Sequence, residues 1–386
     1  MIRNDCSKTM ETLLGEGFTR KYAEDYLGLA AKEYGNPAFD KEYVEWAHAG
    51  GFLAENASAY RLTEEAAGHY LTDYDYAKVW PLNNWTRIWI NDKLTLKQML
   101  ADTRYDALMP RYFFYCINGK LLKLHDAPNP GKAADEAEFL TVLKEKREFA
   151  CKPCNGATSQ GFFRLTYEAG EIRVNGKTLP ESRLEQFIRE HSNYLFTEYI
   201  RPNRFFARYS EHIHTLRIVV LNTNGDNPGI VGGYLRIPHK ESGEANYIVL
   251  SQSENGQYNL ILDVDYSTGR FGNGKKVFID RVEDAEYHPD THVKMEGTID
   301  HMEDLRETVL GISRRFCTLE WMGFDIGIAE NGFQCMEINS HPGIKYMQVY
   351  KPLMDDERVR DYMAGKLETI GRMNKEQLAI RNSIPR

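Results

Sequence analysis

Residues 322–343 read MGFDIGIAENGFQCMEINSHPG, two strand-like runs separated by the turn sequence ENG at 330–332. Asp325 lies in the first run, and Glu337 and Asn339 are two positions apart in the second. Because side chains along a strand alternate between its two faces, Glu337 and Asn339 share a face. If the two runs pair as neighbouring strands, they present three oxygen-bearing side chains together.

Carboxylate and amide oxygens are the ligands that magnesium prefers in proteins. Asp325, Glu337 and Asn339 therefore form a candidate metal site. The same residue types also cap turns and lie on solvated sheet faces, so their spacing alone leaves both interpretations open.

Cationic side chains interrupt several apolar strand-like runs. Lys152 lies in the run 149–153 and precedes a loop with two glycines, 155–161. Glycines let backbone N–H groups approach a phosphate closely, and a lysine can neutralise its charge. Arg217 and Arg236 lie within apolar runs and would need anionic partners there, which a triphosphate could supply. Arginines in surface salt bridges are the alternative.

The chain begins with a helical part and continues with a strand-rich part. Apolar residues at three-to-four spacing predict helices over residues 7–72, which we interpret as a separate region. A connector over residues 80–90 then leads into a predicted helix, 93–100, and a hairpin turns at Asn118-Gly119. Strand-like runs dominate from about residue 149. A strand pair, a helix and a larger sheet indicate an α+β fold.

Length and charge narrow the class of protein. A chain of 386 residues exceeds the roughly 250–300 residues of a single core, so we expect two or three subdomains. The net charge of −8 argues against a nucleic-acid binder. No apolar run approaches the ~18 residues of a membrane helix, and the amino terminus lacks a signal-peptide core. With six scattered cysteines, these features predict a cytoplasmic protein.

Three other motifs carry less weight. Cys151 and Cys154 form a C-x-x-C pair, but no second pair follows at zinc-ribbon spacing, so we expect strand packing. Residues 269–276, GRFGNGKK, nearly match a P-loop but end in lysine instead of serine or threonine. We interpret them as a basic surface turn. His212 and His214 alternate on one strand face, which favours a structural or substrate-contacting role.

The order of these segments resembles that of ATP-grasp enzymes over roughly residues 90–350. The sequences NDK at 91–93, KP at 152–153 with its loop, FTEYI at 196–200, the strand arginine and finally Asp325 with Glu337-x-Asn339 follow one another. More narrowly, IHTLRI at 213–218, HPDT at 288–291 and MEINSHPG at 336–343 resemble the sugar-transfer-associated ATP-grasp group, which is linked to surface-polysaccharide biosynthesis.

The resemblance implies an α+β ATP-grasp fold whose two lobes enclose ATP. It divides the chain into an N-terminal helical region (1–78), a pre-ATP-grasp segment (79–144), a small lobe (145–203) and a large lobe with a C-terminal helical tail (204–386). The helical N-terminal region differs from the usual amino-terminal lobe of that fold, which leaves the substrate open.

The resemblance also implies a role for each matching residue. Those that would contact ATP are Lys93, Lys152, Asn155, Gly156, Ser159, Gly161, Glu198, Tyr199 and Ile200. Magnesium, as two ions, would be held by Asp325, Glu337 and Asn339. Arg217 and Arg236 would face the transferred phosphate and the intermediate.

The implied activity is ADP-forming ligation in surface-polysaccharide or natural-product biosynthesis. ATP would activate a small-molecule carboxylate as an acylphosphate, which an amine then attacks. Either substrate could be linked to a sugar or a carrier. Two alternatives stay open: a phosphotransferase on the same fold, and an inactive nucleotide-binding protein. The substrates and the oligomeric state do not follow from the sequence.

Overall fold

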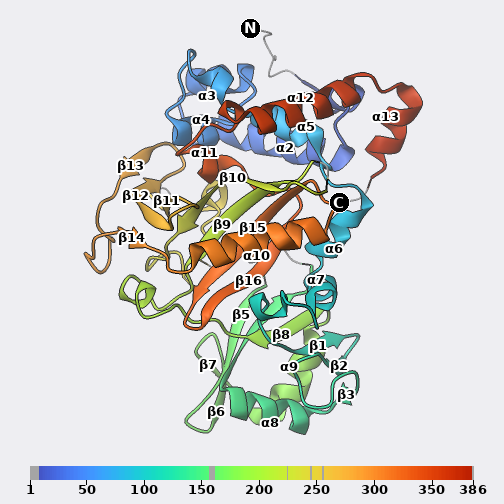
Figure 1. Cartoon of the computed structure of the whole chain (residues 1–386), viewed down its shortest axis with the longest axis vertical. Helices are drawn as coiled ribbons and strands as arrows, with labels where there is room; N and C mark the ends of the chain where they lie inside the picture. The colour runs from blue at the N-terminus through green and yellow to red at the C-terminus, as the bar shows by residue number, and fades with distance from the viewer. Residues whose placement is uncertain (1–7, 156–160, 224, 244–245, 254–255, 385–386) are drawn as a thin grey trace.

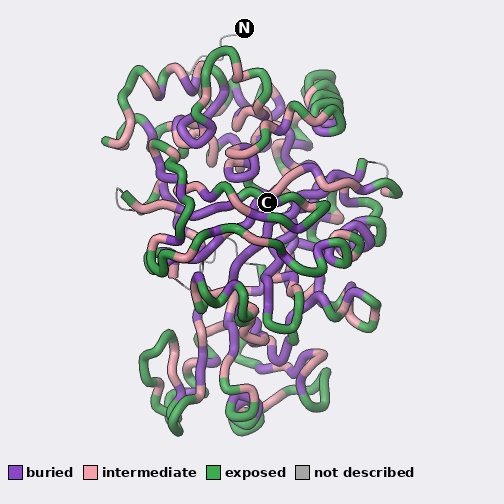
Figure 2. The backbone as a smooth tube through the Cα atoms, turned by 60° about the vertical axis from the view of Figure 1, so that its left-hand side comes forward, coloured by how far each residue is buried: buried purple, intermediate pink, exposed green. Residues whose placement is uncertain are grey.

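The computed structural model describes residues 8–155, 161–223, 225–243, 246–253 and 256–384. In this part of the chain, two eight-stranded sheets are flanked by helices (Figure 1). This architecture confirms the predicted α+β class. Figure 2 shows that the buried backbone is concentrated in the central sheet, and exposed segments lie at the periphery. None of the described helices combines the length and the apolar character needed to span a membrane.

Sheet A lies at the lower end of Figure 1, in the strand order β3-β2-β1-β8-β4-β5-β6-β7. Its strands are β1 (Tyr112–Ile117), β2 (Lys120–Lys123), β3 (Ala133–Ala134), β4 (Glu148–Pro153), β5 (Phe163–Glu168), β6 (Glu171–Val174), β7 (Lys177–Leu179) and β8 (Tyr194–Glu198). Helices α8 (Glu136–Lys146) and α9 (Leu184–Glu190) pack with the sheet in an aromatic core. The sheet thus joins strands of the pre-ATP-grasp segment to strands of the small lobe.

The turn between β1 and β2 is the one that the sequence predicts. Asn118 and Gly119 have positive φ values of 50° and 72°, and Ile117 pairs with Lys120. Two consecutive residues with positive φ define the type I′ turn, which Asn-Gly favours. The predicted hairpin is confirmed.

Sheet B is the larger unit at the centre of Figure 1, in the order β13-β12-β11-β10-β9-β15-β16, with β14 paired to β12. Its strands are β9 (Thr215–Leu221), β10 (Gly229–Arg236), β11 (Asn259–Val264), β12 (Arg270–Val277), β13 (Val282–Asp284), β14 (Gly297–Thr298), β15 (Trp321–Ala329) and β16 (Gly332–Asn339). Every residue of β9 and β15 is buried. These two strands therefore form the structural centre of the sheet.

The interpretation of residues 269–276 as a basic surface turn is wrong. Residues 270–277 form β12, in which Phe271, Gly274 and Val277 are buried. The turn lies just before the strand, because Gly269 donates its N–H to the Asp265 carbonyl. The basic side chains favoured the interpretation as a turn. A strand near the edge of a sheet can nevertheless expose such side chains on one face while its alternate residues pack into the core.

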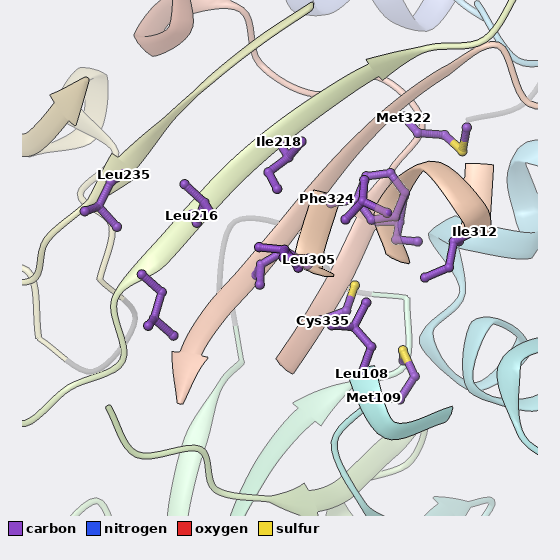
Figure 3. Packing of buried hydrophobic residues seen from close by; sticks show 14 of the residues in the cluster. Leu108, Met109, Leu216, Ile218, Leu235, Leu305, Ile312, Met322, Phe324 and Cys335 are labelled. Carbon is purple, nitrogen blue, oxygen red and sulfur yellow. The ribbon is translucent and has the colours of Figure 1, made fainter. Parts of the chain in front are cut away.

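One face of sheet B packs against helix α10 (Met302–Arg315), and the connector helices α6 (Ile88–Asn91) and α7 (Lys93–Leu100) contribute to the same core. Figure 3 shows this packing, in which Leu305 and Ile312 of α10 approach the apolar side chains of the strands. The core members of the central strands are Leu216, Ile218 and Val220 of β9 and Met322, Phe324, Ile326 and Ile328 of β15.

The opposite face of sheet B is covered by helices from both ends of the chain (Figure 1). They are α3 (Lys41–Ala49), α4 (Ala54–Tyr60), α5 (Asp73–Val79), α11 (Lys345–Gln348) and α12 (Glu357–Gly371). Helices α1 (Met10–Gly15) and α2 (Arg20–Tyr34) form a smaller core with Tyr74 of α5, and α13 (Lys375–Asn382) contacts α1. The predicted N-terminal helices are therefore present. However, α3, α4 and α5 share one hydrophobic core with β9, β15 and α12, so the region is not separate.

Candidate active site

Four of the predicted site residues lie on one face of sheet B. The strand register places Asp325 opposite Arg217 on one side and opposite Glu337 on the other, and Asn339 opposite Gly323. On β9 and β15, the residues of this face alternate with those of the α10 core. The side chains therefore project from the face that the N-terminal helices cover farther along the strands.

The acidic cluster, which we define as Asp325, Glu337 and Asn339, is held by direct hydrogen bonds. The Arg217 guanidinium donates to both Asp325 oxygens, Nε to Oδ1 at 2.5 Å and Nη2 to Oδ2 at 2.9 Å. Asn339 Nδ2 donates to Asp325 Oδ2 at 3.2 Å and to Glu337 Oε1 at 3.3 Å. A buried ion pair needs such complete hydrogen bonding to offset the loss of hydration. The three predicted metal ligands are thus brought together.

Burial and neighbouring positive charges act in opposite directions on the pKa values of the two carboxylates in the acidic cluster. Desolvation raises the pKa of Glu337, but the charges of Lys93 and Arg217 outweigh it and hold the pKa at about 2. Glu337 is therefore ionised at neutral pH. Desolvation raises the pKa of Asp325, against the opposing charge of the paired Arg217.

Lys93 reaches the acidic cluster from helix α7. Its Nζ lies 3.2 Å from Glu337 Oε2. The preceding residue, Asp92, caps the helix by accepting from Thr95 N at 2.7 Å, and the Lys93 N–H donates to the Cys154 carbonyl at 3.1 Å. Lys93 is thus fixed between the end of β4 in sheet A and β16 in sheet B.

Lys152 enters from β4 of sheet A. Desolvation lowers its pKa to about 8, and the neighbouring charge of Lys93 adds to the effect, while Glu337 opposes it. Three cations, Lys93, Lys152 and Arg217, therefore face two carboxylates, Asp325 and Glu337. The surplus positive charge at the junction of the two sheets suits an anion such as a phosphate group.

Arg236 lies on β10, beside the acidic cluster, and its charge acts to lower the pKa of Asp325. Its guanidinium carbon is 5.1 Å from the centre of the Tyr247 ring. Its Nε is buried and has no hydrogen-bond partner among the described residues. Arg236 therefore differs from Arg217, whose guanidinium is satisfied by Asp325.

Three further predicted ATP contacts, Glu198, Tyr199 and Ile200, lie at the end of β8 and directly after it. Glu198 accepts from Arg111 Nη2 at 2.8 Å, and the Tyr199 ring centre is 4.6 Å from the Arg164 guanidinium. Two residues after Ile200, Pro202 forms an isolated antiparallel bridge with Ala329 of β15. Residues 198–200 thus lie where the chain leaves sheet A towards sheet B.

The loop after Lys152 is described at its two ends. Asn155 Oδ1 accepts from Asn193 Nδ2 at 2.8 Å. Gly161 has a φ of 76°, and a Cβ atom there would lie 2.5 Å from the Tyr194 hydroxyl. Only glycine therefore fits this position. Gly156 and Ser159, the other two predicted loop contacts, lie outside the described residues.

Two positioning asparagines were missed by sequence reasoning. Asn83 is 1% exposed, and its side chain donates to the Trp321 and Ser340 carbonyls and accepts from Glu320 N and Trp321 N. Asn91 Oδ1 accepts from Ser340 N at 3.3 Å. Both tie the connector to the residues beside Asn339. The available signals were the place of Asn83 in the connector and of Asn91 in the NDK motif at 91–93, to which no positioning role was assigned.

Tyr76 of helix α5 was also missed. Its hydroxyl donates to the Pro342 carbonyl at 2.6 Å, and its ring stacks on His341 at 3.9 Å between ring centres. Pro342 packs so closely on Gly323 that a Cβ atom there would lie 2.4 Å from it. The segment that follows Asn339 is thus held between β15 and the N-terminal region.

The donor set of the acidic cluster fits magnesium. Two carboxylates and one amide supply hard oxygen ligands beside a surplus of cations that can bind phosphate. Among the described residues, no group of three or more His, Cys, Asp and Glu side chains is placed to hold a metal by itself. Magnesium would therefore need the Asn339 oxygen and oxygens from a bound substrate in addition to the carboxylates.

Cys151 and Cys154 are free, buried thiols. Burial raises the pKa of Cys154 to about 12, and its Sγ donates to Asp92 Oδ2 at 3.2 Å. Reactive cysteines instead have a lowered pKa, so redox chemistry is disfavoured.

We expect Cys151→Ser with Cys154→Ser to change the free energy of ATP binding by less than about 1 kcal/mol, because serine keeps the donor to Asp92. Titration calorimetry with MgATP would measure this. Loss of binding together with loss of a stoichiometric zinc ion would contradict it. Cys317→Ser, at an exposed thiol, is the matched control.

A model of the family described as sugar-transfer associated ATP-grasp matches residues 83–357. No curated protein matches the chain. The chain also resembles solved structures at low identity. One is the ATP-grasp ligase PsnB complexed with a minimal precursor (12% identity, TM-score 0.37, 74% of this chain and 64% of that chain). Another is D-alanyl-alanine synthetase A from Vibrio cholerae O1 biovar eltor (15% identity, TM-score 0.39, 72% of this chain and 66% of that chain).

A third is N5-carboxyaminoimidazole synthetase from Staphylococcus aureus (11% identity, TM-score 0.33, 69% of this chain and 50% of that chain). The chain thus spans less than two thirds of the length of each of these three proteins. At such identities and TM-scores these likenesses carry no conclusion about this chain.

Proposed function

The chain belongs to the sugar-transfer associated ATP-grasp family, and from this premise we propose that it is an ATP-dependent, ADP-forming ligase. In the reaction that we propose, it joins a small-molecule carboxylate to an amine. The observation that carries the proposal is the junction of the two sheets. There Lys93 of helix α7 and Lys152 of sheet A approach the acidic cluster.

ATP would lie between the two sheets. Lys93 and Lys152 would bind its phosphates, together with the loop that runs from Asn155 to Gly161. The backbone of residues 198–200 would meet the edge of the adenine, because this segment runs from β8 to the point where the sheets join.

The first step would be attack of the substrate carboxylate oxygen on the γ-phosphorus. The bond from this phosphorus to the β,γ-bridging oxygen breaks, so that ADP leaves and an acylphosphate forms. The amine nitrogen then attacks the acyl carbon, the bond to the phosphate oxygen breaks, and the amine loses a proton.

Arg236 would face the transferred phosphoryl group, and Arg217 would hold Asp325 in its orientation. Magnesium held by Asp325, Glu337 and Asn339 would supply positive charge that stabilises the transferred group. Lys93 would keep Glu337 ionised and aligned through their contact at 3.2 Å. The role of these residues is thus positioning and charge stabilisation, which dominate phosphoryl transfer.

An ADP-release screen over pooled carboxylic acids and amines tests the proposal. A ligase releases ADP and free phosphate in equal amounts, and only when both an acid and an amine are present. ADP without free phosphate would show a phosphotransferase. Absence of ADP from every pool, with MgATP binding intact, would favour an inactive nucleotide-binding protein.

We expect Lys152→Met to weaken MgATP binding by about 1.5 to 3 kcal/mol, because a charged hydrogen bond to phosphate is lost. Lys152 in the free protein has a pKa of about 8, so it is charged below that pH and neutral above it. Wild-type affinity should therefore fall as the pH rises from 7 to 9. Lys152→Arg, which stays charged, should lessen this fall.

Titration calorimetry at both pH values would measure these affinities. Lys177→Met, at an exposed position of sheet A, is the matched control. An unchanged affinity in Lys152→Met, or the same decline with pH in Lys152→Arg, would remove Lys152 from the site.

A further inference from the structure

A second group of polar and aromatic side chains lies beyond the acidic cluster, where the N-terminal region meets sheet B. Its members are linked by ring contacts. The Arg236 guanidinium is 5.1 Å from the Tyr247 ring centre, and that centre is 6.4 Å from the one of Tyr346. Lys345 Nζ is 5.5 Å from the Tyr346 ring centre and forms an ion pair with Glu55. We name these five residues the distal group.

The distal group carries more positive than negative charge. Arg236 and Lys345 contribute two cations, and Glu55 contributes one carboxylate. Arg236 is half-buried, and its Nε has no hydrogen-bond partner within the described chain. A buried N–H donor without a partner is costly until an acceptor binds it. The distal group is therefore complementary to the carboxylate of a ligand.

Glu55 is held firmly in place at the start of helix α4. Its backbone N–H and that of Ala54 donate to the carboxylate of Glu33, at 2.9 and 2.8 Å. The side chains of Glu55 and Lys345 are only 20% and 11% exposed. Nearby, Gln348 Oε1 accepts from Leu71 N at 2.9 Å and so joins α11 to the N-terminal region. Glu55 is thus held in its position before any ligand binds.

We propose that the distal group binds the carboxylate substrate, and that this substrate is a small acid that also carries N–H or O–H donors. Its carboxylate faces Arg236, on the side of the acidic cluster, and its donors face Glu55. Amino acids and sugar acids share this chemistry. The proposal rests on the proposed ligase function, because it assigns the acid of that reaction to a site.

This assignment gives the N-terminal region a role in specificity. Glu55 lies outside residues 83–357, the part that matches the family. Arg236, Tyr247, Lys345 and Tyr346 lie within it. The recognition of the substrate carboxylate would therefore come from the matched part, and the choice among carboxylates from the N-terminal helices.

Saturation-transfer NMR would test the site without requiring turnover. The protein, with magnesium and β,γ-methylene-ATP, is mixed with a pool of α-amino acids or with a pool of uronic and other sugar acids. We expect members of one pool to bind. Arg236→Met and Glu55→Gln should each weaken that binding about tenfold or more. Their matched controls, Arg314→Met and Glu64→Gln at exposed positions, should not.

Thermal unfolding of each variant establishes that it is folded. If Glu55→Gln does not fold, Tyr247→Leu takes its place, because it removes the ring between Arg236 and Tyr346. Binding of neither pool, or equal binding by wild type and by the folded variants, overturns the proposal. Binding of an acid that supports no ADP release with any amine would instead contradict the ligase function and leave the site intact.

Discussion

Glu337→Gln is expected to bind MgATP but to lose turnover by about 10²- to 10³-fold, the usual cost of removing one group that stabilises the transferred charge. Glu337 has a pKa of about 2 and is ionised at neutral pH. Glutamine keeps the shape of the side chain and removes the charge that faces Lys93 and that would face magnesium. Nucleotide docking should persist, because the lysines and the residues proposed to contact the adenine are unchanged.

Nucleotide affinity and ADP formation would be measured separately across a magnesium titration, with the acid and amine that the screen identifies. Glu330→Gln is the matched control, since this glutamate is exposed in the turn of the same hairpin. Near-normal turnover of Glu337→Gln at limiting magnesium would return Glu337 to a structural role.

Arg217→Met is expected to destabilise the protein by about 3–5 kcal/mol, because it leaves the Asp325 carboxylate buried without its partner. The side chains of Arg217 and Asp325 are 11% and 8% exposed. Asp325→Asn should also lower the free energy of unfolding, in addition to its effect on turnover. The double variant should lose less than the sum of the two single losses, since it leaves no unpaired charge.

Urea unfolding at pH 7 would measure all three variants, with Arg270→Met, at an exposed position of the same sheet, as the control. In Arg217→Met, the unpaired Asp325 should have a folded-state pKa above its unfolded value. Ionisation of Asp325 then destabilises the folded variant at neutral pH. The loss in free energy of unfolding relative to wild type should therefore shrink as the pH falls below that pKa. If Arg217→Met lowers the free energy of unfolding by less than about 1 kcal/mol at pH 7, the Arg217–Asp325 pair is not needed for stability.

The local features of this protein were readable from its sequence. Strand periodicity placed Glu337 and Asn339 on one face, and Asn118-Gly119 marked a hairpin, because both depend on the backbone geometry of a few consecutive residues. The resemblance to the ATP-grasp family, carried by short motifs, is confirmed by the family match. The roles assigned to the site residues stay predictions.

The errors arose where neighbouring residues did not determine the outcome. Residues 269–276 contain glycines and lysines that favour a turn, but pairing with β11 makes them a strand. The N-terminal helices were identified, yet their core with sheet B was not, because an amphipathic pattern shows that a face is buried and not what buries it.

Composition and short-range pattern thus determined the fold class, the hairpins and the candidate ligands. Only the tertiary structure decided which charges meet. It pairs Arg217 with Asp325 across 108 positions of sequence and Glu55 with Lys345 across 290. It also leaves the Nε of Arg236 without a partner in the described chain. Such contacts depend on strand register and on the packing of whole elements, which no local segment of sequence encodes by itself.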